Sequence, residues 1–137
     1  MIAKREHSRA QIENKLRSKA FDTDAINAIL DEMEQKNWLN DERFAEMFIH
    51  GRVSRGQGPI RIANELKVRG VNSRIIQEQL DAYDIDWLQL CQETAEKRFG
   101  SPLPNDKNDR VKVNRFLLYR GYSQSLILEV YKAYQSA

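Results

Sequence analysis

The sequence is poor in the residues that make cross-links, metal sites and membrane spans. Its single cysteine, Cys91, excludes an internal disulfide and fits a reducing cytoplasm. Two histidines beside one cysteine argue against a dedicated zinc site. No apolar run approaches the roughly 20 residues of a membrane span, and the first residues, Met1 to His7, lack a signal-peptide core. These absences predict a cytoplasmic protein without a membrane anchor.

Catalytic constellations are also lacking. Asp41 and Glu42 are adjacent, so on a helix they diverge by about 100° and suit a helix N-terminus better than an acid–base pair. The Gly56-Gln57-Gly58 segment follows no strand and precedes no Gly-Lys-Ser/Thr sequence, so it does not fit a phosphate-binding loop. With no nucleophile–base pair, metal spacing or cofactor fingerprint, the sequence predicts a non-enzymatic protein with no catalytic residues, cofactor or metal.

Helical periodicity runs through the whole chain. Nothing alternates as a strand does, and the composition has only three prolines. Capping residues precede each apolar stripe and predict helices that begin near Ser8, Asp22 or Thr23, Asn40 or Asp41, Gly58, Asn72 or Ser73, and Asp86, with two more after Asp109. The segment 101–109, with two prolines and four Asn or Asp residues, is the most obvious linker.

An internal repeat organises these helices. Seven positions recur at intervals of 50 and 51 residues: Ile12/Ile62/Val113, Leu16/Leu66/Leu117, Lys19/Arg69/Arg120, Ala20/Gly70/Gly121, Phe21/Val71/Tyr122, Asp22/Asn72/Ser123 and Ile26/Ile76/Ile127. Each unit is a helix, a tight turn and a second helix, and a linking helix precedes the second and third units. The pattern predicts an all-α fold of tandem three-helix repeats in a curved, elongated array.

The repeat also sets the expected domain limits. The modules are 1–39, 40–84 and 85–137, and the first lacks its leading helix because few residues precede its capping Ser8. Ala20 replaces the glycine of the other two units at the turn, which indicates that the first unit has drifted. Since modules of such an array bury their apolar stripes against one another within one chain, we expect a monomer.

Positive charge gathers in the middle of the chain. From Arg43 to Arg74 there are seven Lys/Arg against two Asp/Glu, whereas residues 1–42 and 75–137 are each slightly acidic. The candidate binding residues of this stretch are Arg52, Arg55, Arg61, Lys67, Arg69 and Arg74, and the third unit adds Arg115, Tyr119 and Arg120. The set is rich in arginine, which recognises carboxylate or phosphate in a bidentate manner, and a solvated charge face is the alternative interpretation.

A predicted hinge, made by Gly56, Gly58 and Pro59, separates Arg52 and Arg55 from Arg61. Bending there would bring the arginines on its two sides together. From the residues alone, the sequence predicts a helical repeat protein with a basic surface for an acidic partner. That partner is a nucleic acid, a protein, or a complex of both.

The segment from Trp38 to Ala45, the hinge segment Gly56–Ile62 and the segment from Glu65 to Val71 resemble the signature of the RecX family of bacterial RecA regulators. Arg5–Ser8 with Leu16 resembles the family's first-repeat motif, and Arg115–Tyr122 resembles its third. The resemblance implies an array that lodges in the groove of a RecA–single-stranded DNA filament. It also implies inhibition of filament growth, ATP hydrolysis, strand exchange and self-cleavage of the SOS repressor.

The resemblance implies RecA as the partner, with further contacts to phosphates of single- or double-stranded DNA. A DNA-binding transcription module of the helix-turn-helix kind is the competing hypothesis, since Leu66, Gly70 and Ile76 fit such a turn.

Overall fold

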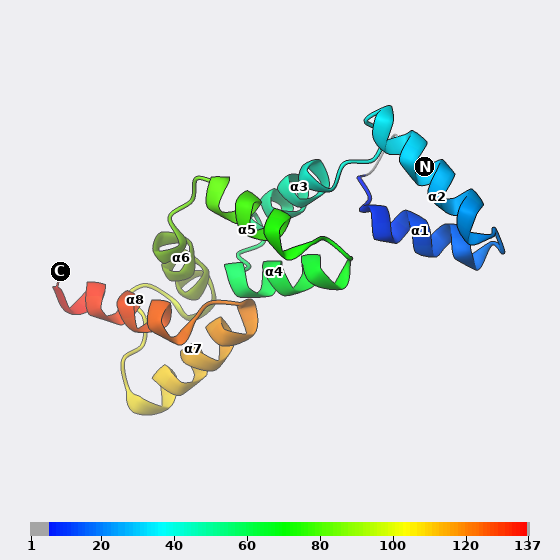
Figure 1. Cartoon of the computed structure of the whole chain (residues 1–137). Helices are drawn as coiled ribbons and strands as arrows, with labels where there is room; N and C mark the ends of the chain where they lie inside the picture. Colours follow the sequence, from blue (N-terminus) through cyan, green and yellow to red (C-terminus); the bar gives the residue numbers. More distant parts are fainter. Residues whose placement is uncertain (1–5, 137) are drawn as a thin grey trace. The chain divides into compact units, whose positions relative to one another are not determined.

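The computed structural model describes residues 6–136. These residues form eight α-helices and no strand (Figure 1). The helices are α1 (Arg9–Ser18), α2 (Thr23–Gln35), α3 (Asp41–Val53), α4 (Pro59–Val68), α5 (Ser73–Ala82), α6 (Trp87–Phe99), α7 (Lys107–Arg120) and α8 (Gln124–Ser136). The all-α prediction is confirmed. No helix among the described residues is both long enough and apolar enough to cross a membrane.

The predicted capping residues begin the helices. Ser8 forms a complete capping box with Gln11, which pairs the backbone N–H groups of both residues. The Asp22 carboxylate accepts from the Ala25 N–H at 2.9 Å. Asn40, Asn72, Asp86 and Ser123 accept from helix N–H groups in the same way. These contacts satisfy donors that a helix N-terminus otherwise leaves unpaired.

The repeat is visible in backbone conformation as well as in sequence. Ala20, Gly70 and Gly121 all have positive φ, at 65°, 84° and 101°. The isoleucines 26, 76 and 127, which follow six residues after each turn, are all buried. The left-handed residue ends the first helix of each unit, and the capping residue two positions later starts the second.

The structure divides into two compact units. Unit 1 comprises residues 1–50 and 63–83, and unit 2 comprises residues 51–62 and 84–137. The core of unit 1 includes Ile12, Ile26, Leu30, Met33 and Leu39. The core of unit 2 gathers α6, α7 and α8 around Cys91, Ala95, Leu103, Val113, Leu117, Tyr122, Ile127, Val130 and Tyr131. Helices α3 and α4 each supply residues to both units.

An equivalent hydrogen bond to the carbonyl of a turn residue occurs once in each unit. In unit 1, the buried Ser8 hydroxyl donates to the Arg69 carbonyl at 2.6 Å. In unit 2, the Gly58 N–H donates to the Arg120 carbonyl at 2.8 Å. Ser8 and Gly58 occupy equivalent positions in the repeat, as do Arg69 and Arg120. The turn of one repeat therefore packs on the start of the first helix of the preceding repeat; we call this contact the repeat joint.

The joint requires a residue without a side chain at the turn. A Cβ on Gly121 would lie 2.4 Å from the Arg61 Cβ, and one on Gly70 would lie 2.2 Å from the Ala10 Cβ. Both distances are shorter than non-bonded carbon atoms tolerate. Glycine is thus needed twice over at these positions, for its positive φ and for close approach.

The loop predicted over 101–109 is present but shorter, because α7 already begins at Lys107 with Asp106 as its N-cap. Its residue Leu103 is buried in the unit 2 core, and the Tyr131 hydroxyl donates to the Pro104 carbonyl at 3.3 Å. These two contacts hold the loop against the core of the third repeat.

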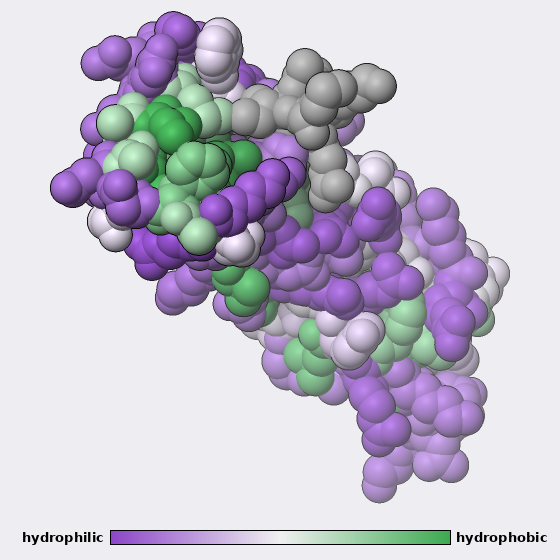
Figure 2. All heavy atoms as spheres, turned by 90° about the vertical axis from the view of Figure 1, so that its right-hand side faces the viewer, coloured by the Kyte–Doolittle hydropathy of each residue, from purple (hydrophilic) through white to green (hydrophobic). Residues whose placement is uncertain are grey.

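The first repeat differs from the others at one core position. Phe21 is 47 % exposed, whereas its equivalents Val71 and Tyr122 are 3 % and 1 % exposed. Among residues 6–39 the structure describes only α1 and α2, and the residues before them, 1–5, lie outside the described chain. Figure 2, which faces the α1–α2 end, shows apolar atoms gathered there inside a hydrophilic rim.

A glycine-to-alanine pair tests the repeat joint. Gly121→Ala should lower the free energy of unfolding by about 2–4 kcal/mol, because it adds a left-handed alanine and a clash with α4. Gly51→Ala, inside α3 with nothing near its added Cβ, should be neutral or stabilise by up to about 1 kcal/mol. Urea unfolding measures both, and equal effects would contradict the joint.

The reverse exchange tests the drifted turn of the first repeat. Ala20 has φ of 65°, a conformation that costs an alanine about 1–2 kcal/mol and glycine almost nothing. The strain relieved by glycine is partly offset by the larger backbone entropy of glycine in the unfolded chain. Ala20→Gly should therefore raise the unfolding free energy by about 0.5–1 kcal/mol in urea unfolding. A destabilised variant would show that Ala20 is not strained.

Candidate anion-binding surface

The candidate residues of unit 1 have partners of their own. The Arg69 guanidinium lies 4.7 Å from the centre of the Phe48 ring, and its Nη1 is 3.9 Å from the Glu65 carboxylate. Arg74 lies 4.0 Å from the Glu78 carboxylate one helical turn away. Lys67 is exposed on α4. The structure therefore gives Arg69 a packing contact and both arginines a neutralising charge within unit 1.

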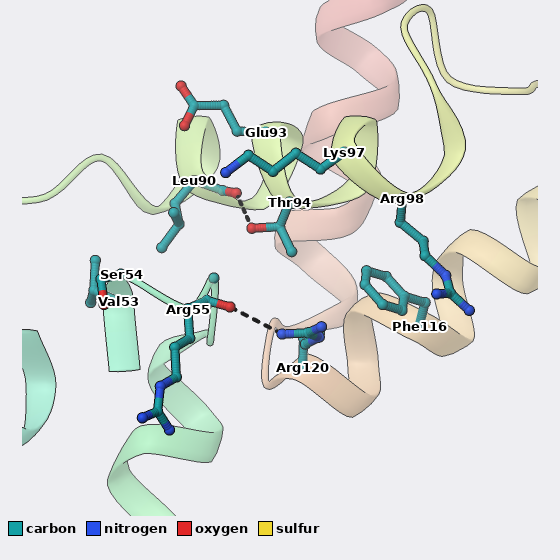
Figure 3. A pocket seen from close by; sticks show the side chains of 11 residues that line it. Val53, Ser54, Arg55, Leu90, Glu93, Thr94, Lys97, Arg98, Phe116 and Arg120 are labelled. Carbon is teal, nitrogen blue, oxygen red and sulfur yellow. Dashed lines mark hydrogen bonds between the residues drawn. The ribbon is translucent and has the colours of Figure 1, made fainter. Parts of the chain in front are cut away.

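The candidate residues of unit 2 lie nearer to one another. Arg55 and Arg120 both line a cavity of about 300 Å³ between the end of α3, α6 and the end of α7 (Figure 3). Its lining consists of Val53, Ser54, Arg55, Gly56, Leu90, Glu93, Thr94, Lys97, Arg98, Phe116 and Arg120. All of these residues belong to unit 2. Two of the predicted binding residues, Arg55 and Arg120, thus share this cavity with two further cations, Lys97 and Arg98.

Aromatic packing holds the arginines of the cavity. The guanidinium groups of Arg98 and Arg120 lie 5.7 Å and 5.1 Å from the centre of the Phe116 ring. Phe116 packs edge-on against Phe99 at 5.4 Å. Arg120 Nη1 also donates to the Arg55 carbonyl at 3.0 Å, as Figure 3 shows. These contacts fix Arg120 across the mouth of the turn that follows α3.

The wall of the cavity is built on a buried tyrosine. The Tyr122 hydroxyl donates to the Gly56 carbonyl at 2.8 Å and lies 3.4 Å from the Thr94 hydroxyl. Thr94 in turn donates to the Leu90 carbonyl at 2.7 Å. Burial raises the pKa of Tyr122 to about 12, so the phenol is neutral at physiological pH. Tyr122 thereby ties the glycine segment after α3 to α6 and α8.

The predicted hinge lies in this closely packed region. Gly56 has φ of 77°, and a Cβ there would lie 2.8 Å from the Thr94 hydroxyl oxygen. A Cβ on Gly58 would lie 2.4 Å from the Gly121 carbonyl oxygen. Pro59 is the first residue of α4, as predicted. The two glycines have a steric role in the joint, and bending at this segment stays a prediction.

Two other candidates form a small exposed patch beside the joint. Tyr119 is 73 % exposed, and the Arg61 guanidinium lies 5.0 Å from the centre of its ring. Arg61 Nη1 also approaches the Tyr119 carbonyl at 3.4 Å. Arg115 is exposed on α7 and Arg52 is half-buried in α3, and neither lines the cavity. An aromatic ring with one face covered by arginine suits recognition by stacking.

Sequence reasoning missed the five residues of α6 that line the cavity, among them three polar or cationic ones on one side of the helix. Thr94, Lys97 and Arg98 are spaced by three and four positions, so one face of the helix carries all three. That spacing was readable, but α6 lies outside the basic stretch from Arg43 to Arg74. That this face of α6 points toward the end of α3 depends on tertiary packing, which local sequence patterns do not predict.

The lone cysteine belongs to the core. Cys91 is fully buried, and burial raises the pKa of its thiol to about 12. Across residues 6–136, no group of three or more His, Cys, Asp or Glu side chains could hold a metal ion. The buried Cys91 thiol therefore serves packing.

Comparisons with known proteins cover the whole chain. Family models described as the first, second and third three-helix domains of RecX match residues 1–33, 40–80 and 84–131. The regulatory protein RecX of Halorhodospira halophila is 37 % identical over 123 residues, which cover 90 % of this chain and 76 % of that protein. The regulatory protein RecX of Serratia proteamaculans is 32 % identical, with 96 % and 92 % covered.

The fold agrees with a solved structure of the same name. A crystal structure of RecX from Lactobacillus salivarius superposes with a TM-score of 0.85 at 23 % identity. The match covers 99 % of this chain and 90 % of that one, and shows that the two share a fold.

The buried hydroxyl of the cavity wall gives a prediction with a matched control. Tyr122→Phe should lower the unfolding free energy by about 1–3 kcal/mol, because the Gly56 carbonyl loses its donor in a buried setting. Tyr119→Phe removes a solvated hydroxyl and should change it by less than about 0.5 kcal/mol. Urea unfolding at pH 7 measures both, and equal losses would contradict the role of Tyr122.

The pKa of Tyr122 also predicts how its contribution to the unfolding free energy changes at alkaline pH. Its folded-state pKa of about 12 is above the ordinary value of 10, so the stabilisation by the neutral phenol is complete below pH 10. It is lost as pH rises through about 12. The difference between wild type and Tyr122→Phe should thus be constant from pH 7 to pH 9 in urea unfolding and shrink above pH 10. A difference that changes between pH 7 and pH 9 would contradict this assignment.

Proposed function

Because this chain belongs to the RecX family, whose curated members are named regulatory proteins, we propose that it binds RecA–single-stranded DNA filaments and inhibits their activity. One observation carries the proposal: three domain models of this family match in order, from residue 1 to residue 131. The activities inhibited would be ATP hydrolysis, recombination and the coprotease function of the SOS response.

The relatives are named as regulators and not as enzymes, and the chain acts by binding. The mode of binding follows from repeat architecture and charge. The tandem repeats, expected at 1–39, 40–84 and 85–137, would touch more than one RecA protomer. The cations of unit 2 would face acidic protein surface or DNA phosphate. The chain would act as a monomer in the cytoplasm, where RecA filaments form.

An ATPase assay tests the proposal directly. Single-stranded-DNA-dependent ATP hydrolysis by RecA should fall when the full chain is added in amounts well below that of RecA. Helix-turn-helix transcription modules instead bind a specific duplex sequence without RecA. Sequence-specific duplex binding with unchanged ATP hydrolysis would overturn the proposal in favour of that alternative.

The exposed patch on unit 2 gives a variant for the same assay. Tyr119→Ala should weaken inhibition about tenfold, since exposed Tyr residues beside arginine are frequent binding hot spots. It should leave the thermal midpoint unchanged, because the ring is largely in solvent. Leu128→Ala, an exposed apolar residue on α8, is the control and should inhibit as the wild type does. Equal inhibition by wild type and both variants would exclude Tyr119 from the contact.

A further inference from the structure

The cavity of unit 2 carries a positive charge that its own surroundings do not neutralise. Arg55, Lys97, Arg98 and Arg120 line it together with one carboxylate, Glu93. Within the described chain none of these four cations forms an ion pair. In Figure 3 the Glu93 carboxylate points away from Arg120. The lining therefore has a formal excess of three positive charges.

Five arginines outside the cavity form ion pairs within the described chain. Arg9 bonds to Asp31 and Glu34, Arg43 to Glu6, and Arg17 to Glu13. Arg69 and Arg74 also have carboxylates close by. A sequence with 20 acidic residues thus places carboxylates beside many of its cations but few around this cavity. Like charges gathered in a concave surface raise the local concentration of anions.

Neighbouring groups also fix the position of the Arg120 side chain in the cavity lining. Phe116 lies beneath both Arg98 and Arg120, and the Arg55 carbonyl holds one nitrogen of Arg120. A guanidinium has five N–H donors, so Arg120 retains most of its capacity for an incoming anion. Little rearrangement of this side chain is then needed on binding, which lowers the entropic cost.

We propose that this cavity is a binding site for phosphate groups. A single carboxylate would neutralise only a part of the excess charge. A phosphate ester with a free terminal group carries up to about two negative charges, and successive phosphates of a strand carry one each, so both supply more charge and present several oxygens to converging arginines. The cavity of about 300 Å³ lies at the lower end of the range for small-ligand sites. The phosphate belongs either to the backbone of single-stranded nucleic acid or to a free phosphate ester.

Two charge-matched double variants test the site in the absence of RecA. Lys97→Gln with Arg98→Gln removes two cations from the lining of the cavity. Lys107→Gln with Lys112→Gln removes two exposed cations of α7 that do not line it. All four residues except Arg98 are free of aromatic contacts in the described chain, so thermal midpoints should stay close to that of the wild type.

Pyrophosphate, by isothermal titration, and a labelled oligothymidylate, by fluorescence anisotropy, are the two probes. The cavity variant should bind at least one of them about tenfold more weakly, with the control within about twofold of wild type. A loss with pyrophosphate identifies a site for free phosphate esters, and a loss confined to the oligonucleotide identifies a strand site. Equal affinities in the two variants for both probes would overturn the proposal.

The result of these binding experiments does not depend on the result of the ATPase assay. A chain that inhibits RecA while the cavity variant binds both probes normally would retain the proposed function and lose the phosphate site. A chain without effect on RecA whose cavity variant loses phosphate binding would retain the site alone. Each proposal can therefore fail without the other.

Discussion

The repeat joint is the contact on which the rest of the structure depends. A small helix pair cannot bury its apolar stripe alone, so each repeat needs its neighbour at close range. This close approach is made by hydrogen bonds to turn carbonyls: the Ser8 hydroxyl donates to the Arg69 carbonyl in unit 1, and the Gly58 N–H donates to the Arg120 carbonyl in unit 2. Because a joint links the turn of one repeat to the helix start of the one before, compact units form around joints rather than around repeats.

The joint also explains why the cavity lies where it does. Arg120 belongs to the turn of the third repeat, and its carbonyl is an acceptor in the joint while its guanidinium reaches the Arg55 carbonyl. Tyr122, two residues on, reaches the Gly56 carbonyl from the same turn. The segment after α3 is therefore held from one side by the residues that form the joint. The cationic cavity is therefore built in part from the turn that forms the joint of unit 2.

Much of the fold was predictable because its determinants are local. Capping residues, helical periodicity and the seven repeated positions specify where helices start, where they turn and which faces are buried. The loop between α6 and α7 was predictable from its prolines and its Asn and Asp residues, but the burial of Leu103 was not, since this residue gives no local sign of the core that receives it. For the binding surface, sequence identified Arg55 and Arg120 but not Lys97 or Arg98. Their contribution depends on where α6 points, which only tertiary packing decides.

The third repeat differs from the first two at the place where a joint would form. Helix α7 begins at Lys107, three residues earlier than the starts of α1 and α4 at the equivalent repeat positions. Asp109, the equivalent of Ser8 and Gly58, is therefore already helical, and its N–H points to the Asp106 carboxylate at 3.4 Å. Neither a free N–H nor a hydroxyl is presented there, and a carboxylate would repel the carbonyl of an incoming turn. At α7 a longer helix and an acidic residue thus stand where α1 and α4 present the groups that form the joint.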